Sequence, residues 1–484
     1  MFVSKLAAIA VAVAMGLCAI TPATARAEVL SIEEHLTVEA GSTSEWEGGD
    51  YVAINMTKGD SLAWFGVIYG NETHPNCPTL VTAYVRFLGG AEVRNEDGAI
   101  MVPAMGIPVL TVYVQKLFAL IEFSDDGYLR PMENDVVGAG NGLFDFEHLG
   151  GSLTDFALGS VEPVHKLLEL NGTWERSEIE ETRTLGTTEK EWQFTLSQKN
   201  QLYDKIWDNE GAVDDDGSRP GEERDGKLNE AAFTFHVGTR LDKYNVSVPW
   251  YTVGWKDGGV ISSSEAEPRT YEGTSLTTEL KFDHALKGWD YARDDNLLML
   301  ETGTVFATFI PEFVQSWLDL QFVNATGQDA AGIAELETFT GGEQDILATD
   351  DIPEGSHQIV KDSITFRDNW QKVGEMNWVS NVTVDHEERE MKFQIHAGEN
   401  IDWPGENDDG YVRGILFIGG YIYPAGHDIF HDPAFVANAL FLPIGIGFDI
   451  LGMAAGMYAL GTMCAVAVGL GYVAARQVRG LRRR

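Results

Sequence analysis

An acidic segment near the middle of the chain has the residue types of a calcium-binding loop. Carboxylates recur every few residues between positions 204 and 230, around the turn-forming Gly217. Calcium takes about six to eight oxygen ligands from a flexible loop. An EF-hand is excluded because Ala212 stands at its first ligand position and Pro220 interrupts the loop. The alternative is a solvated hairpin tip. The candidate ligands are Asp208, Asp214, Asp216, Glu223 and Asp225.

Tryptophans in the second half of the chain could form stacking platforms for sugars, because the apolar faces of sugars suit aromatic rings. The candidates are Trp255, Trp289 and Trp403. The alternative is an ordinary core position, since tryptophan is a normal core residue of β-sandwiches. Nearby, Glu399, Asp402 and Glu406 resemble strand-borne glycosidase carboxylates only in type. Their odd spacing puts the first two on opposite faces of a strand, so the sequence does not support a two-carboxylate site.

No nucleophile, base or cofactor motif stands out elsewhere. His427 and His431 have the spacing of a zinc-protease pair, but Asp428 occupies the place where that motif needs its general-base Glu. Proline and glycine on both sides leave room for barely one helical turn, which predicts a plain turn before a membrane segment. We find no Gly-x-Ser-x-Gly, phosphate loop or dinucleotide fingerprint. No catalytic residue is assigned, and the sequence favours a non-enzymatic protein.

Acceptor sequences for asparagine-linked glycans indicate an extracellular protein. An isolated Asn-x-Ser/Thr triplet carries little information, whereas a set confined to the region between the two apolar ends favours a glycosylated surface. The sequence predicts glycan attachment at Asn55, Asn71, Asn171, Asn245, Asn324 and Asn381.

Apolar and polar residues alternate with period two through most of the chain, which is typical of half-buried antiparallel strands. Residues 192–196, 233–237, 280–282 and 382–384 show it clearly, and a hairpin is expected to join residues 381–384 to 391–395 across 385–390. Glycines and prolines scattered between these runs suit a sandwich or jelly roll. We therefore predict an all-β fold of two or three sandwich-like modules followed by one transmembrane helix.

The two ends of the chain predict membrane topology. Residues 1–27 have the cation, the short apolar run and the Ala-x-Ala ending of a cleaved signal peptide. Residues 450–475 lack charge and are long enough to cross a bilayer as a helix, and the arginines of 476–484 belong on the cytoplasmic side. These features predict a type I protein, anchored in the cell membrane with its ectodomain outside. A two-helix hairpin that includes residues 435–448 and a tail that is processed away are the alternatives.

The predicted boundaries divide the chain as follows. Residues 1–27 are the signal peptide, 28–180 an N-terminal β-rich domain, 181–425 a second sandwich domain with an acidic insertion at 204–230, 426–449 a juxtamembrane segment, 450–475 the membrane helix and 476–484 the cytoplasmic tail.

The charge balance limits the partners. A formal net charge of -40 disfavours nucleic acid, which needs a basic surface, and points to calcium binding or to a high-salt habitat. Cys18 and Cys464 fall in the two apolar ends, so Cys77 is the single ectodomain cysteine. It is expected to be buried or to form an intermolecular link. This cysteine usage is typical of a prokaryotic, archaeal-like surface rather than an animal one.

Together these features predict a membrane-anchored, glycosylated cell-surface protein with a binding, adhesion or envelope-structural ectodomain. Calcium is the one cofactor expected, and the expected partners are other surface proteins or glycans. The alternative is a surface-tethered carbohydrate-active enzyme or carbohydrate-binding protein.

Overall fold

The alternating sequence forms strands throughout the part of the chain that the computed structural model describes. The described residues are 36–43, 48–58, 61–125, 128–130, 135–137, 142, 144, 163–206, 226–256, 259–310, 321–324, 358–359, 363–367, 372–404 and 411–441. The predicted signal peptide, the membrane helix, the arginine tail and the candidate calcium ligands at 208–225 lie outside these ranges. Within them, no helix has the length and hydropathy needed to span a membrane.

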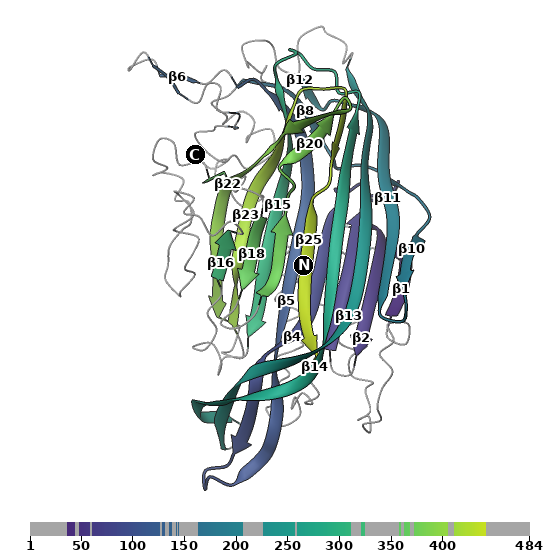
Figure 1. Ribbon diagram of the computed structural model, residues 1–484. Coiled ribbons are helices and arrows are strands. Elements are labelled where there is room, and N and C mark those ends of the chain that lie inside the picture. The colour runs from purple at the N-terminus through teal and green to yellow at the C-terminus, as the bar shows by residue number, and fades with distance from the viewer. Residues whose placement is uncertain are drawn as a thin grey trace.

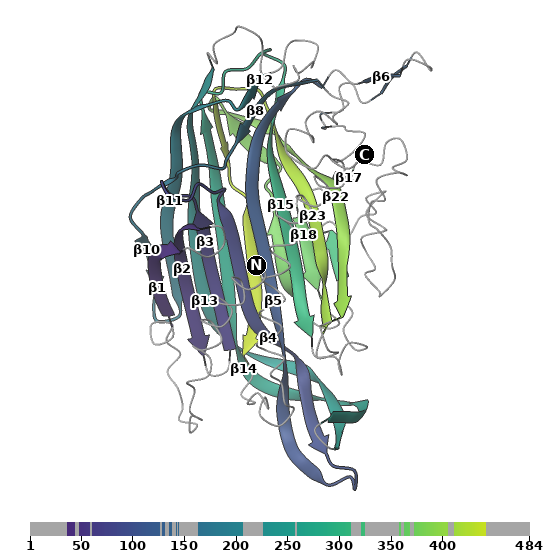
Figure 2. The ribbon, with the colours of Figure 1, turned by 180° about the vertical axis from the view of Figure 1, so that it is seen from behind.

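The strands stack in two layers that face each other as a β-sandwich (Figures 1 and 2). Hydrogen bonding orders the first layer as β1 (Leu36–Thr43), β2 (Gly49–Lys58), β3 (Ser61–Tyr69), β4 (Thr79–Arg94), β5 (Ile100–Phe123), β15 (Leu297–Ile310), β23 (Tyr411–Pro424), β22 (Lys392–Pro404) and β17 (Gln358–Ile359). The second layer runs β10 (Glu180–Leu185), β11 (Glu189–Leu202), β13 (Lys227–Lys256), β14 (Gly259–Lys287), β25 (Ala434–Phe441), β19 (Lys372–Asn377), β18 (Ser363–Arg367) and β16 (Gln321–Asn324).

Short strands extend these layers at their ends. They are β6 (Tyr128–Arg130), β7 (Asp135–Val137), β8 (Val164–Glu169), β9 (Glu175–Arg176), β12 (Lys205–Ile206), β20 (Asn381–Val384), β21 (Glu387–Glu390) and β24 (Asp428–His431). The strand β8 pairs with β5 and β12, β9 with β11, and β24 with both β14 and β20. The strands β6 and β7 form a separate small sheet.

The core lies between the layers and is rich in aromatic rings. Tyr113 of β5 stacks on Phe435 of β25 with ring centroids 3.8 Å apart, and Phe306 of β15 stacks on Phe366 of β18 at 4.0 Å. The Tyr84 hydroxyl of β4 donates to a backbone carbonyl of β19. These contacts cross from one layer to the other, which is how a sandwich removes the inner faces of both sheets from water.

The predicted alternation is confirmed where the structure describes it. Trp192, Phe194 and Leu196 are buried, as are the apolar residues at 233–237 and 280–282. The predicted partner in the hairpin after β20 is wrong. The strand turns within two residues, Asp385 and His386, which both have positive φ, and its partner is Glu387–Glu390. A turn of this twist suits a tight hairpin.

Strands on the two sides of residue 180 share the first layer, and the short strand β9, before residue 180, pairs with β11 of the second layer. Within the first layer β5 pairs with β15, and a parallel pairing of β4 with β13 joins the two layers. The boundary predicted there therefore falls inside one hydrogen-bonded sandwich. Residues 428–441, which were expected to form a plain turn and an apolar juxtamembrane stretch, form β24 and β25 and pair with β14. Their alternation buries Ile429, His431 and Phe435, which is why they join the sheet.

Two long hairpins continue beyond the sandwich and form a projection that we call the arm (Figures 1 and 2). It consists of residues 89–107 of the β4–β5 hairpin and residues 250–269 of the β13–β14 hairpin. Its hairpins pair in parallel, Trp250–Gly254 against Gly90–Arg94. Close approach requires glycine here, because a Cβ on Gly90 would lie 2.1 Å from the Trp250 ring.

Candidate functional site

The arm is held together by one arginine that contacts three strands. The Arg269 guanidinium lies 3.9 Å from the centroid of the Trp250 ring, within cation–π range. Its Nη2 atom is 3.7 Å from a Glu92 carboxylate oxygen, and its Nη1 donates to the Pro103 carbonyl at 3.5 Å. Arg269 on β14 thus ties its own hairpin to β4 and β5. The two hairpins of the arm are therefore connected by side-chain contacts as well as by strand pairing.

Apolar side chains are exposed near the end of this arm. Ile100, Met101 and Ile261 have exposed fractions of 52%, 49% and 55%. Their neighbours at the end of the arm are charged, because Glu96 and Asp97 occupy the β4–β5 turn and Glu96 pairs with Lys256. Ile100 and Met101 lie on β5 and Ile261 lies on β14, which are the two edge strands of the arm. Exposed apolar side chains beside charged ones at the end of a projecting element are typical of a protein-contact surface.

The neighbouring part of β5 is an apolar edge. No charged residue occurs between Gly98 and Gln115, and among the described strands the arm half of β5 forms strand pairs with β4 only. The opposite edge of the arm, on β14, carries exposed Glu265 and Glu267 and the strand-blocking Pro268. The charged and proline-containing β14 edge is therefore protected from pairing with strands of other molecules. The apolar β5 edge has fewer such features.

A buried carboxylate fixes the opposite end of the sandwich. Glu122, with an exposed fraction of 0%, accepts from the indole Nε1 of Trp289 at 3.0 Å and from the Asn296 side chain at 2.6 Å. It also accepts from the backbone N–H of Ala292 at 2.6 Å, and Lys166 Nζ lies 3.8 Å away. These contacts anchor the loop between β14 and β15 to β5. Removing the carboxylate would leave several buried donors unpaired.

Beside this carboxylate, Ser124 and His165 form a pair that resembles a nucleophile and its base. The Ser124 Oγ lies 2.6 Å from His165 Nε2 and 2.9 Å from Asn296 Oδ1. Because the Asn296 amide donates to Glu122, its oxygen faces Ser124 and must receive the serine proton. His165 Nε2 then donates to Ser124, the reverse of what nucleophile activation needs. The pair is therefore a structural hydrogen bond that continues through Asn296 to Glu122.

The outer face of the second layer carries a cluster of charged groups. His236 Nε2 lies 3.1 Å from Asp283 and its Nδ1 lies 3.7 Å from Glu191, while Lys281 Nζ lies 4.0 Å from Asp432. The hydrogen bond to Asp283 raises the pKa of His236. Burial and the adjacent Asp283 raise the pKa of Asp432. Among the described residues, no group of His, Cys, Asp and Glu has an arrangement that could hold a metal ion.

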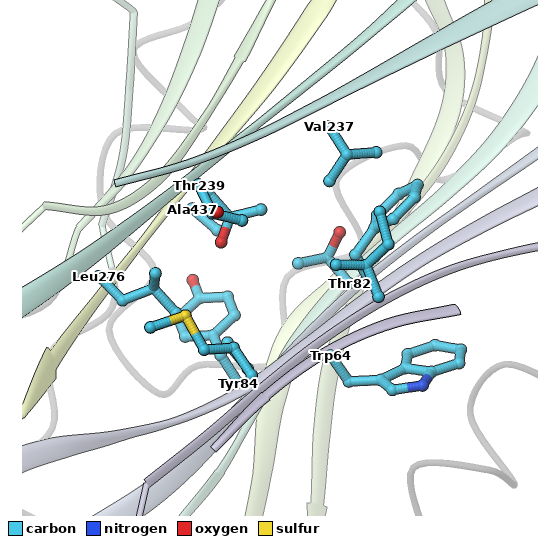
Figure 3. A pocket seen from close by; sticks show the side chains of 12 residues that line it. Trp64, Thr82, Tyr84, Val237, Thr239, Leu276 and Ala437 are labelled. Atoms are coloured by element: carbon cyan, nitrogen blue, oxygen red, sulfur yellow. The ribbon is translucent and has the colours of Figure 1, made fainter. Parts of the chain in front are cut away.

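A small internal cavity and an open surface hollow are the candidate ligand sites in the described part of the chain. A cavity of about 10 Å³ lies between the layers, which is room for one water molecule and not for a ligand (Figure 3). Its lining includes Trp64, Thr82, Tyr84, Val237, Thr239, Leu276 and Ala437. The second hollow is an open cup on the surface where Lys199 and Lys287 face Glu230 and Asp428. Its charges balance, so it offers no net attraction to an anion.

The candidate sugar-stacking residues do not form a platform. The prediction for Trp289 is wrong, because the ring is buried and its N–H is held by Glu122. Trp255 is half-buried in the arm, and the side chain of Trp403, in β22, lies outside the description, as does Glu406. The calcium site at 208–225 stays a prediction. Cys77 is buried, as one of the two alternatives expected, with its sulfur 3.8 Å from the Phe118 carbonyl.

The predicted glycan sites differ in their surroundings. Asn171, Asn245 and Asn381 are exposed. Asn55 is half-buried, with its amide nitrogen donating to Glu39 at 3.1 Å and its amide oxygen out of contact with solvent. Asn71 is half-buried, with its amide nitrogen donating to Asp50. The side chain of Asn324, in β16, lies outside the described residues.

Sequence reasoning overlooked Arg269 and Glu122. Glu122 had a readable signal, since one acid within the apolar run Ala119–Phe123 marks a buried carboxylate that needs partners. Arg269 had none, because its contacts Glu92 and Pro103 come from strands far away in the sequence.

Comparison with known proteins finds no family model that matches this chain and no similar curated protein. The inference about function therefore depends on the geometry of the arm and on the features of the sequence.

Proposed function

We propose that the chain is a membrane-anchored, glycosylated cell-surface protein whose sandwich presents the arm as its contact surface for another surface protein. The observation that carries this proposal is the projection of a cross-braced arm with Ile100, Met101 and Ile261 exposed beside charged neighbours. A rigid projection lowers the entropic cost of binding, and interfaces combine exposed apolar side chains with charged neighbours. The signal peptide, the membrane helix and the calcium site are inferred from the sequence alone.

The alternative function, a carbohydrate-active enzyme, has less support. Trp289 is committed to the core, and the Ser124–His165 pair has the wrong hydrogen-bond polarity for nucleophilic attack. The adhesion or envelope function needs no reacting group and uses what the arm exposes.

Photocrosslinking tests the role of the arm. A photoreactive amino acid is placed at Met101 or Ile261 in the full chain, and intact cells that produce the protein are irradiated. We expect discrete crosslinked products from both positions because both side chains face outward on the arm. The matched control is Glu279, an exposed position of β14 within the sandwich. Equal yields from Glu279 and the arm positions, or no products from the arm, would overturn the proposal.

Glycopeptide mass spectrometry tests the surface assignment. We expect high occupancy at Asn171 and Asn245, because their side chains are exposed. Asn381 is also exposed, but its amide nitrogen donates to the Glu388 carboxylate, so we expect lower occupancy there. Occupancy at Asn55 and Asn71 is expected to be several-fold lower. Asn55 bonds to Glu39, and the Asn71 nitrogen donates to Asp50 at 2.7 Å, so a glycan would have to break these contacts.

The full chain purified from its own host is the sample, since glycosylation depends on that machinery. Occupancy at Asn55 equal to that at Asn245 would contradict the ranking. The absence of glycan from every acceptor would remove the glycoprotein element and leave the role of the arm to the crosslinking result.

A further inference from the structure

Two histidines and a tyrosine connect the layers through the core. The Nδ1 of His284, on β14 in the second layer, lies 2.7 Å from the Tyr423 hydroxyl of β23 in the first layer. The same hydroxyl lies 3.2 Å from Nδ1 of His431 on β24, whose Nε2 is 2.8 Å from the Val379 carbonyl. All three side chains are buried, with exposed fractions of 1% or less. The chain of contacts therefore bridges the two sheets out of reach of solvent.

The backbone carbonyl determines the direction of every proton in this relay. Val379 can only accept, so His431 carries its proton on Nε2 and its Nδ1 is an acceptor. The Tyr423 hydroxyl must then donate to His431, and its oxygen accepts from His284 Nδ1. His284 consequently has a bare lone pair on Nε2. That atom is buried and has no hydrogen-bond partner among the residues that the structure covers.

Aromatic rings surround the bare nitrogen. The His284 ring makes edge contacts with Phe233 at 5.4 Å and with Tyr421 at 5.1 Å between centroids, and it lies 5.0 Å from Phe282. His431 is 5.5 Å away. A proton on His284 Nε2 would create a buried cation with no acceptor and a second imidazole close by, which is strongly unfavourable.

We propose that the His284–Tyr423–His431 relay is an acid-sensitive tie that holds the two sheets together at neutral pH and loosens when its histidines take up protons. A proton on His431 Nδ1 removes the acceptor of the tyrosine, and a proton on His284 Nε2 charges the core. Either event weakens the link between the layers at its centre. This inference rests on the core alone and is independent of the proposed function.

The direction of the pH effect follows from the burial of both rings. Burial lowers the pKa of His431 to about 4, and burial with the adjacent His431 lowers the pKa of His284 well below its usual range. In the unfolded chain both would titrate near about 6.5. Between these values the unfolded chain binds more protons than the folded one. Stability is therefore complete above about pH 6.5 and is lost as the pH falls toward 4.

Other titrating groups near the relay act in the opposite direction. On the outer face, Asp283 lies next to His284 in sequence, Asp432 lies next to His431, and His236 and Lys281 lie beside them. The raised pKa of Asp432 makes the fold gain stability on acidification, as does the raised pKa of His236. Tyr421 and Tyr423 stay protonated, because burial raises the pKa of each. Neither Asp432 nor His236 therefore accounts for a loss of stability on acidification. Glu181 and Asp295, outside the relay, have a lowered pKa and act in the same direction as the relay, so the variant comparison below is needed to separate them.

The test measures thermal and denaturant unfolding of the full chain from pH 7.5 to 4. For His431 alone, a shift from about 6.5 to about 4 corresponds to an unfolding constant that rises about 150-fold between pH 7.5 and pH 4. His431→Gln retains a donor for Val379 and an acceptor for Tyr423 but does not titrate, so we expect most of this dependence to disappear. The control is His427→Gln, an exposed histidine close by, which should keep the wild-type pH dependence.

An unchanged pH dependence in His431→Gln, or no loss of stability in the wild type down to pH 4, would overturn the proposal. If the variant does not fold, hydrogen–deuterium exchange at the histidine C2 positions of the wild-type chain decides the matter by mass spectrometry. We expect the titration midpoints of His284 and His431 to lie well below the value of about 6.5 for a free imidazole. Midpoints near 6.5 for the two buried rings would reject the tie.

Discussion

Replacing Glu122 with Gln is expected to lower the free energy of unfolding by about 3 kcal/mol. The carboxylate accepts from Trp289, Ala292 and Asn296 and faces Lys166. A glutamine side chain has the same shape, but its NH₂ group would face N–H donors where the carboxylate oxygen accepts from them. The neutral amide would also leave Lys166 without its buried counter-charge. Denaturant unfolding of the full chain measures the loss.

The matched control is Asp290→Asn, which removes the other carboxylate next to Lys166. Asp290 Oδ2 is 3.6 Å from Lys166 Nζ, but its side chain is 69% exposed, so water screens the pair. We expect this substitution to cost under about 1 kcal/mol. If Glu122→Gln were as mild as Asp290→Asn, Glu122 would not be the anchor of the loop between β14 and β15.

Replacing Gly90 with Val is expected to separate the two hairpins of the arm and to cost about 2 to 3 kcal/mol. A Cβ at this position would lie 2.1 Å from the buried ring of Trp250, so the indole would have to leave its place. Its departure also removes the ring on which Arg269 lies. Limited proteolysis should then cut the arm before the sandwich, because the hairpins no longer protect each other.

Gly238→Val provides the comparison for this substitution. Gly238 lies on β13 within the sandwich, and the nearest atom to a Cβ there is 3.8 Å away, which is ordinary contact. We expect a change within about 0.5 kcal/mol and unchanged proteolysis. An arm in Gly90→Val that resists protease as well as the wild type would show that the Trp250 packing does not hold the hairpins. Where Gly90→Val does open the arm, crosslinks from Met101 should weaken with it.

The strands and their faces were accessible from the sequence because side-chain alternation is a local property. Trp192, Phe194 and Leu196 on β11 and Leu280 and Phe282 on β14 point into the core as their period of two requires. The same phase places His284 and His431 inside, since His284 follows the buried Leu280 and Phe282 and His431 comes two positions after the buried Ile429. The inward direction of these histidines was therefore readable, although their partners were not.

The hairpin after β20 shows the limit of that local information. The period of two determines which face of the sheet a residue occupies, but the turn determines the register of the two strands. The two-residue turn at Asp385–His386 makes Glu387–Glu390 the partner of β20. These two residues are not a strong turn signal, because neither is a glycine. An error of this kind moves a strand without changing the fold class.

What the sequence determined on its own is the all-β class, the inward phase of each strand and the excess of acidic charge. Only the tertiary structure decided that strands from both halves of the chain share one sandwich, that Trp289 serves Glu122, and that Arg269 braces the arm. The physical reason is that β-sheet pairing joins residues far apart in the chain. Such pairings depend on which sheet edges meet, and no local pattern of residues encodes that choice.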